Sequence, residues 1–477
     1  MTQTTTTQSL DLAALGKAYG DGAVLPTQLI EMLYSRIAAH PDPNVWISLL
    51  PQTEVMAEAQ RLEALSSDKA AALPLYGIPF AVKDNIDVAG MPTTVGCPDF
   101  AYTPEKSATV VEKLLSAGAL LIGKTNLDQF ATGLVGTRSP YGPVSNPFNP
   151  AYISGGSSSG SAVAVASGLV SFALGTDTAG SGRVPAGYTN IVGLKPTRGL
   201  ISAAGVFPAC RTLDCVSIFA LTVDDASAVL RVCEGDDPAD AYSRMRPAYA
   251  TLTEEAIRVH PRSSAAPFRF GIPQPHQLEF FENSEYAQLY VEGLTLLEKL
   301  GGERVEIDFA PLTAVANLLY EGPWVAERYA AVKEFFDARP DAFLPIIRSI
   351  LEKAKTYSAA DAFSAQYRLE ALRREVAPLW ASIDILVLPT AGTIYTIAEV
   401  QADPLALNSN LGRYTNFANL LDMCALALPN GFEAGGLPAG LTLLAPTFAE
   451  ERLLGIGRDF QRRRGLPLGA TGQIFPF

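Results

Sequence analysis

The sequence predicts an α/β protein built on a single large mixed β-sheet, with helices covering both faces of the sheet. Two observations predict this fold. Short apolar segments of strand length alternate with longer helical patterns, which is typical of a sheet packed between helical layers. The chain has 477 residues, of which 48% are hydrophobic, so it can bury a large core. No internal repeat or low-complexity linker divides it, and we expect one domain over 1–464.

Residues 1–70 predict helices that precede the sheet. In the segment 26–40, apolar residues fall on one helical face, and Pro26 suits a first helical turn. The segment 52–65 predicts a second helix with one charged side.

The core of the prediction is the segment 71–220. Ile78 to Val82 predicts a short buried strand, and 119–125 predicts another. Between them we expect a helix with Ser107 as its N-cap and Gly118 as its stop. We also expect 126–134 to be helical.

The rest of the chain predicts helices followed by closing strands. We expect a helical region over 275–382, closing strands over 383–464 and a tail over 465–477. The expected helices are 224–233, 279–300, 312–337 and 349–382, and the expected strands are 268–273, 304–309, 384–390 and 440–446. The polar segment 239–267 predicts an irregular loop.

Composition excludes several classes of partner. The formal net charge of −13 argues against a nucleic-acid-binding surface. No apolar run reaches the ~18 residues of a membrane span, and the first residues lack the pattern of a signal peptide. We therefore expect a cytoplasmic protein that contacts neither nucleic acid nor membrane.

Cysteine and histidine are sparse and scattered. The five cysteines do not form a disulfide framework or a zinc motif, and we expect them to be small buried side chains. The three histidines (His40, His260 and His276) lie far from any glycine-serine turn and are expected at the surface. A Ser-His-Asp mechanism is therefore not indicated.

The segment from Ser154 to Ala186 carries the chemistry. It contains two glycine-serine turns, and Ser157 and Ser181 each follow a glycine in one of them. Such turns present backbone N–H groups beside a hydroxyl, which are the components of acyl transfer. A flexible linker is the alternative, but the apolar segment between the turns argues against it.

Lys83 is the candidate base. It ends an apolar strand, whereas most lysines at strand ends are exposed. Burial would lower the pKa of its amine, so that a neutral amine could accept a proton at pH 7. Ser181 would then attack a carbonyl and Ser157 would pass the proton to Lys83.

These segments, together with 193–199, resemble the amidase signature family over most of the chain. The resemblance implies that 71–220 is the catalytic core, with Ser181 as nucleophile, Ser157 as bridging serine after a cis peptide bond, and Lys83 as base. It places the oxyanion hole at the N–H groups of Thr178, Ala179, Gly180 and Ser181. We expect Asp177 and Arg183 to support this turn.

The chain departs from the common family pattern at two positions, and these departures resemble the allophanate hydrolase branch. Ala179 replaces a glycine but keeps its N–H, and Gly182 replaces a bulky residue and is expected to widen or reshape the pocket. The resemblance makes 275–382 the substrate-specificity region, in which Tyr320 and Arg328 bind the substrate.

Three further expectations concern these binding residues. The spacing of Tyr320 and Arg328 puts them two turns apart on one helix face, where a surface arginine and a half-buried tyrosine are the alternative. An arginine can hold the carboxylate of allophanate with two hydrogen bonds. The backbone of Gly133 is expected to line the pocket.

The resemblance implies hydrolysis of the terminal C–N bond of allophanate, releasing ammonia and ultimately carbon dioxide, with no cofactor and no metal. Family allophanate hydrolases often carry a further C-terminal domain, for which this sequence is too short. The expected assembly is a homodimer. The alternatives are another small-molecule amidase, the glutaminase subunit of a tRNA-dependent amidotransferase, or a non-catalytic binding protein on this scaffold.

Overall fold

The computed structural model describes residues 8–247 and 267–474. Its centre is an 11-stranded mixed sheet, as predicted. In spatial order the strands are β1 (Trp46–Leu49), β3 (Leu120–Thr125), β2 (Pro79–Lys83), β4 (Phe172–Asp177), β6 (Cys215–Ala220), β5 (Val192–Lys195), β10 (Cys424–Phe432), β11 (Pro438–Ala445), β9 (Ile385–Pro389), β7 (Phe268–Pro273) and β8 (Gly302–Ile307).

The strands β3, β2 and β4 run parallel to one another, and so do β9, β7 and β8. The strands between these two groups pair antiparallel. Because β2 and β4 are parallel neighbours, their carboxyl ends meet at the same edge of the sheet.

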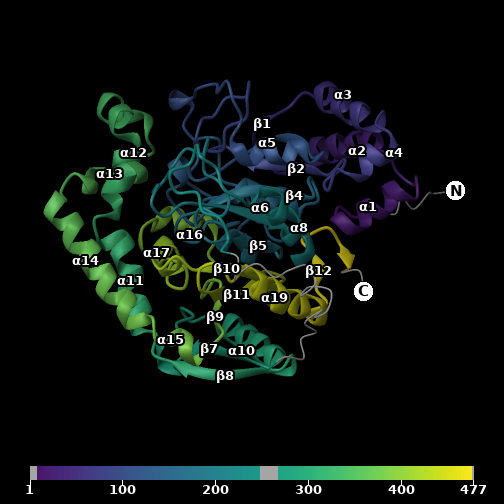
Figure 1. The fold of residues 1–477 in the computed structure, drawn as a ribbon. Helices are drawn as coiled ribbons and strands as arrows, with labels where there is room; N and C mark the ends of the chain where they lie inside the picture. The colour runs from purple at the N-terminus through teal and green to yellow at the C-terminus, as the bar shows by residue number, and fades with distance from the viewer. Residues whose placement is uncertain (1–7, 248–266, 475–477) are drawn as a thin grey trace.

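Helices surround the sheet (Figure 1). Before β7 they are α1 (Leu12–Gly20), α2 (Pro26–Ala39), α3 (Gln52–Glu63), α4 (Ser67–Ala71), α5 (Thr109–Ser116), α6 (Ser159–Ala166), α7 (Val184–Tyr188) and α8 (Val223–Cys233). After β7 they are α10 (Ser284–Lys299), α11 (Ala310–Glu321), α12 (Trp324–Ala338), α13 (Pro345–Ala354), α14 (Ala359–Val376), α15 (Leu379–Ser382), α16 (Ile397–Ala402), α17 (Ala406–Leu411), α18 (Phe417–Leu420) and α19 (Glu450–Arg464). We call α11 to α14 the helical arm, which lies on the opposite side of the molecule from α1 to α4.

Strand β9 shows that both faces of the sheet are buried. Ile385 and Val387 belong to the core cluster that α10 and α19 line, whereas Leu386 and Leu388 belong to a second cluster lined by α11, α14 and α18. Alternate side chains of a strand point to opposite faces, so helices cover both.

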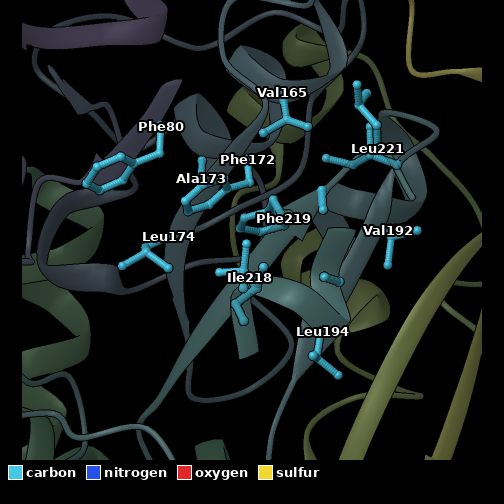
Figure 2. Packing of buried hydrophobic residues seen from close by; sticks show 14 of the residues in the cluster. Phe80, Val165, Phe172, Ala173, Leu174, Val192, Leu194, Ile218, Phe219 and Leu221 are labelled. Carbon is cyan, nitrogen blue, oxygen red and sulfur yellow. The ribbon is translucent and has the colours of Figure 1, made fainter. Parts of the chain in front are cut away.

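Figure 2 shows the packing of buried apolar side chains in the core around β2, β4, β5 and β6. Phe80 of β2 and Phe172 of β4 stack with 5.3 Å between their ring centroids. This packing fixes the two parallel strands that end at the candidate site.

Several predicted elements differ from the structure near the core. Ser107 is not an N-cap, because α5 begins at Thr109 and the Ser107 hydroxyl instead accepts a hydrogen bond from the N–H of Ala89. The segment 126–134 holds only a short 3₁₀ turn (Gln129–Ala131), since Phe130 and Ala131 adopt positive φ.

The later helices begin and end differently from the prediction. Helix α10 starts at Ser284, where the Asn283 side chain caps it, and not at residue 279. The segment 312–337 forms two helices, because Gly322 and Pro323 separate α11 from α12. The segment 349–382 divides among α13, α14 and α15.

The chain after residue 465 is not a simple tail. Pro467–Leu468 pairs antiparallel with Gln473–Ile474. Most of the predicted loop 239–267, including His260, lies outside the described residues. Residues 475–477 of the predicted tail also lie outside them.

The five cysteines (Cys97, Cys210, Cys215, Cys233 and Cys424) are free and buried, which confirms the expectation for them. Within 8–247 and 267–474, no helix is both long and apolar enough to cross a bilayer.

Candidate active site

Lys83 and Ser157 meet at the edge where β2 and β4 end. The Lys83 ammonium group lies 2.8 Å from the hydroxyl of Ser157 and 2.8 Å from that of Thr176. Lys83 and Ser157 are both fully buried. Lys83 is the last residue of β2 and Thr176 lies near the end of β4, so the parallel pairing of the strands creates this contact.

Burial sets the protonation of Lys83. Removal from water lowers the pKa of its amine to about 7, although the carboxylates of Asp128, Asp214 and Asp177 oppose this shift. Arg328 adds to it by repelling the charged form. A substantial fraction of the amine is therefore neutral near pH 7 and can accept a proton.

The loop before α6 holds Ser157. The peptide bond between Gly156 and Ser157 is cis, as the family resemblance implied. The carbonyl of Ser157 accepts a hydrogen bond from the N–H of Asp128 at 3.1 Å. A Cβ at Gly156 would overlap the Asp128 carboxylate, so only glycine fits here.

Ser181 lies in the turn between β4 and α7 and is 3% exposed. A buried ion pair supports this turn, as predicted: Arg183 binds Asp177 through two nitrogens at 2.9 and 3.0 Å. Burial alone would raise the pKa of Asp177, but Arg183, Lys195 and the N–H of Gly182 hold it below its usual range. Two backbone N–H groups donate to this carboxylate. Those N–H groups belong to Gly180 and Gly182.

The backbone donors of the turn divide into two sets. The N–H of Gly180 already donates to Asp177 at 2.9 Å, so it does not point a free donor into the site. Among the described residues, nothing accepts from the N–H groups of Ala179 and Ser181. The Thr415 hydroxyl donates to the carbonyl of Ala179 at 2.7 Å and fixes its peptide.

Gly182 does not widen the pocket, so the structure contradicts that part of the prediction. A Cβ at this position would lie 2.6 Å from the Cβ of Ser217 and 2.7 Å from its hydroxyl. The space is therefore filled by β6, and glycine is needed for close packing of the turn on the sheet.

Tyr320 and Arg328 lie on two helices and not on one. Tyr320 is near the end of α11 and Arg328 is in α12, after the break at Gly322 and Pro323. The break still brings them together, because the Arg328 guanidinium lies 5.7 Å from the centre of the Tyr320 ring. Tyr320 and Arg328 are thus close in space because α11 and α12 form a helical hairpin, which their sequence spacing did not predict.

Arg328 is buried, but only one of its guanidinium nitrogens has a hydrogen-bond acceptor among the described residues. One of its terminal nitrogens donates to the carbonyl of Ala131 at 3.4 Å and to the hydroxyl of Thr132 at 3.2 Å. Within the described residues, no acceptor is found for its other two nitrogens. Burial alone would lower the pKa of the guanidinium, but neighbouring groups, Cys210 and Tyr320 first among them, raise it, so Arg328 stays charged.

Gly133 follows Thr132 and packs against the side chain of Asp128. A Cβ at Gly133 would lie 2.6 Å from the Asp128 carboxylate. That carboxylate accepts hydrogen bonds from the N–H groups of Val135, Gly136 and Arg138. The contacts of Gly133 are thus with this loop, and its role in lining the site stays a prediction.

Asp214 is a residue that the sequence reasoning missed. Its buried carboxylate accepts a hydrogen bond from the Thr178 hydroxyl at 2.5 Å. It is also one of the charges that act on Lys83 and on Arg328. An acidic residue just before a strand that reaches the same sheet edge was the only signal in the sequence.

Three features are typical of an α/β amidase. They are the mixed sheet, the buried contact of Lys83 with Ser157, and a glycine-serine turn whose N–H groups at Ala179 and Ser181 have no acceptor among the described residues. A family model described as Amidase matches residues 28–454. The chain therefore belongs to the amidase family.

Individual relatives narrow the comparison. The chain is 45% identical over 439 residues to a urea amidolyase of Saccharomyces cerevisiae, an alignment that covers 91% of this chain and 23% of that protein. It thus spans under a quarter of that relative. It is 33% identical to a glutamyl-tRNA(Gln) amidotransferase subunit from Synechococcus, and this alignment covers 95% of this chain and 97% of the relative.

A solved structure of Kluyveromyces lactis allophanate hydrolase superposes with a TM-score of 0.87 at 41% sequence identity. The superposition covers 95% of this chain and 74% of that one. A glutamyl-tRNA(Gln) amidotransferase subunit of Thermotoga maritima gives a TM-score of 0.76 at 28% identity, covering 94% of each chain.

The buried Asp177–Arg183 pair predicts a large stability effect. Arg183→Met would leave the Asp177 carboxylate buried without its cation, which typically costs about 3–5 kcal/mol of unfolding free energy. Denaturant unfolding measures this cost. The exposed pair Arg61–Glu58, at 2.6 Å, provides the control, and Arg61→Met should cost less than about 1 kcal/mol. Equal small effects would contradict the structural role of Asp177 and Arg183.

Proposed function

We propose that this protein hydrolyses the terminal C–N bond of allophanate through a Ser-Ser-Lys triad and an acyl-enzyme. The observation that carries the chemistry is the buried contact of Lys83 with Ser157. The choice of substrate is supported by Arg328 and Tyr320, and by 41% identity to a structure of allophanate hydrolase.

The proton path begins at Ser181. Its Oγ bonds to the terminal carbonyl carbon of the urea group while its proton moves to Ser157, and Ser157 passes its own proton to the neutral amine of Lys83. The lysine ammonium then returns a proton, by the same route, to the departing nitrogen. The C–N bond breaks and ammonia leaves.

The acyl-enzyme is resolved by the reverse path. A water molecule loses a proton to the Ser157–Lys83 pair and attacks the acyl carbon, and Ser181 leaves as the protonated hydroxyl. The released dicarboxylate loses carbon dioxide. None of these steps calls for a metal or an organic cofactor.

The oxyanion would be held by backbone donors. The N–H groups of Ala179 and Ser181 are unoccupied in the described part of the chain, and Thr178 completes the predicted set. The N–H of Gly180 does not belong to the proposed oxyanion hole, because it donates to the carboxylate of Asp177. Removal of one such donor typically slows a reaction by about 10²-fold or more.

Arg328 would hold the carboxylate of the substrate. Two of its guanidinium nitrogens have no acceptor among the described residues, which fits a planar anion bound by parallel hydrogen bonds. Within the part of the chain that the structure describes, the Tyr320 hydroxyl has no partner and could add a third hydrogen bond.

A glutaminase subunit of an amidotransferase is the second candidate. The relative from Synechococcus favours it, since the alignment covers 97% of that relative. Its lower identity, 33% against 45% for the urea amidolyase, makes it the weaker proposal.

The pKa of Lys83 predicts the pH dependence. The pKa of about 7 means that the neutral base disappears below pH 7, so kcat/KM should fall about tenfold per pH unit on the acid side. Lys83→Met should lower kcat by about 10²–10⁴-fold. Lys113→Met serves as control, because Lys113 bonds only to carbonyls of Cys233 and Glu234. A flat profile between pH 5 and 8 would remove Lys83 from the mechanism.

Ammonia release from allophanate, malonamate, biuret and glutamine tests the substrate. We expect turnover to be fastest with allophanate. Arg328→Met removes charged hydrogen bonds of about 1.5–3 kcal/mol and should raise KM for allophanate by about 10–100-fold. The effect on a neutral amide should be much smaller.

Arg373→Met is the matched control for this assay, since Arg373 lies on the same arm and bonds to the carbonyl of Leu420. A preference of the wild type for glutamine would favour the amidotransferase candidate. Equal losses on charged and neutral amides in Arg328→Met would show a folding defect and not a lost carboxylate contact.

We also propose a cytoplasmic homodimer. Five buried free thiols are compatible with a reducing compartment. Sedimentation equilibrium should give a mass about twice that of one chain, and a monomer at micromolar concentration would contradict the dimer. Fractionation of the source cells would test the location.

A further inference from the structure

A second buried carboxylate, Asp214, holds the start of the nucleophile turn. We propose that Asp214 is a positioning residue, which acts through the hydroxyl of Thr178 to aim the N–H groups of Ala179 and Ser181. The proposal rests on the proposed function of that turn in acyl transfer.

The carboxylate of Asp214 accepts hydrogen bonds from one side-chain hydroxyl and two backbone N–H groups. One oxygen accepts from the Thr178 hydroxyl at 2.5 Å, and the other accepts from the N–H of Ala209 at 2.8 Å. The N–H of Cys210 lies 3.1 Å from the second oxygen and 3.2 Å from the first. The carboxylate thus ties the loop 209–210 to the turn that begins at Thr178.

The nucleophile turn is fixed from three directions. Asp177 holds its later part through Gly180 and Gly182, and Thr415 holds the carbonyl of Ala179. Asp214 supplies the hold on Thr178, the residue that enters the turn. Without it, the peptide between Thr178 and Ala179 loses the anchor of the Thr178 side chain, whereas Asp177 still holds the N–H groups on either side of Ser181.

The chemistry of the site calls for a carboxylate. Asp214 faces donors only: one hydroxyl and two backbone N–H groups. An ionised carboxylate accepts at every position, whereas an asparagine in its place would turn an N–H₂ group toward one of these donors. Burial raises the pKa of Asp214 to about 6, although the hydrogen bond from Thr178 opposes this shift, so the ionised form prevails above pH 6.

Asp214 also has an electrostatic effect that Thr178 does not share. The charged groups that act on Lys83 are Asp128, Asp214 and Asp177, which raise its pKa, and Arg328, which lowers it. Loss of the Asp214 charge should therefore lower the pKa of Lys83 further. The two residues can be separated by their pH profiles.

The test compares Thr178→Val, Thr178→Ser and Asp214→Asn in steady-state assays with allophanate. Thr178→Val keeps the shape of the side chain but removes the hydrogen bond, and should lower kcat by about 10–100-fold with KM changed less than about threefold. Thr178→Ser should recover most of this loss. Asp214→Asn should lower kcat and move the acid limb of kcat/KM to lower pH, whereas Thr178→Val should leave the limb in place.

A buried hydroxyl outside the site controls for stability. The hydroxyl of Thr442 in β11 lies 2.8 Å from that of Thr390, the residue after β9, and Thr442→Val should lower the melting temperature without lowering kcat. A Thr178→Val enzyme with kcat within threefold of the wild type would overturn the proposal. This outcome decides the matter even if Asp214→Asn does not fold.

A neutral phosphonate that labels Ser181 separates the proposal from the choice of substrate. Its phosphoryl oxygen needs the same donors but its reaction needs no allophanate. We expect Thr178→Val to slow labelling by about the same factor as kcat. A wild type that is labelled but inactive on allophanate would refute the substrate alone, whereas unchanged labelling of Thr178→Val would refute the role of Asp214.

Discussion

Removal of the Lys83 amine from water is the constraint on which the site depends. A lysine at a strand end usually reaches solvent, but here the parallel strands β2 and β4 close around it, and Ser157 and Thr176 are its hydrogen-bond partners. Burial lowers the pKa of the amine to about 7, which is the property that the proposed base needs. The sheet and the chemistry are therefore linked through one side chain.

Fixed carboxylates organise the rest of the site. Asp128 binds the N–H groups of the loop that faces Ser157, Asp177 binds the turn of Ser181, and Asp214 binds Thr178. Each of these buried charges is satisfied by several donors, which makes its position specific. Together they hold the loops that carry Ser157 and Ser181, and they keep the amine of Lys83 from becoming even less basic.

The sequence predicted the sheet, the buried Lys83 and the two glycine-serine turns, because local patterns determine each of them. It failed where tertiary contacts decide. Gly182 was expected to open space that Ser217 fills, and Gly180 was expected to donate an N–H that Asp177 occupies. Asp214 and Thr178 are 36 residues apart in the chain, and no spacing rule connects them. The prediction that Tyr320 and Arg328 bind the substrate came from the family resemblance, and it wrongly placed both residues on one helix.

The helical arm lies apart from the strands that hold the base. Arg328 sits on α12, whose side chains Val332 and Phe336 pack in a separate apolar cluster with α13, whereas Lys83 is anchored by the sheet. A substitution that removes the charge of Arg328 would leave the hydrogen bonds of Lys83 in place, but it would raise the pKa of the amine, because Arg328 repels its charged form. In such a scaffold, a change in the helical arm reaches the buried amine through charge alone and leaves the strands that hold the amine intact.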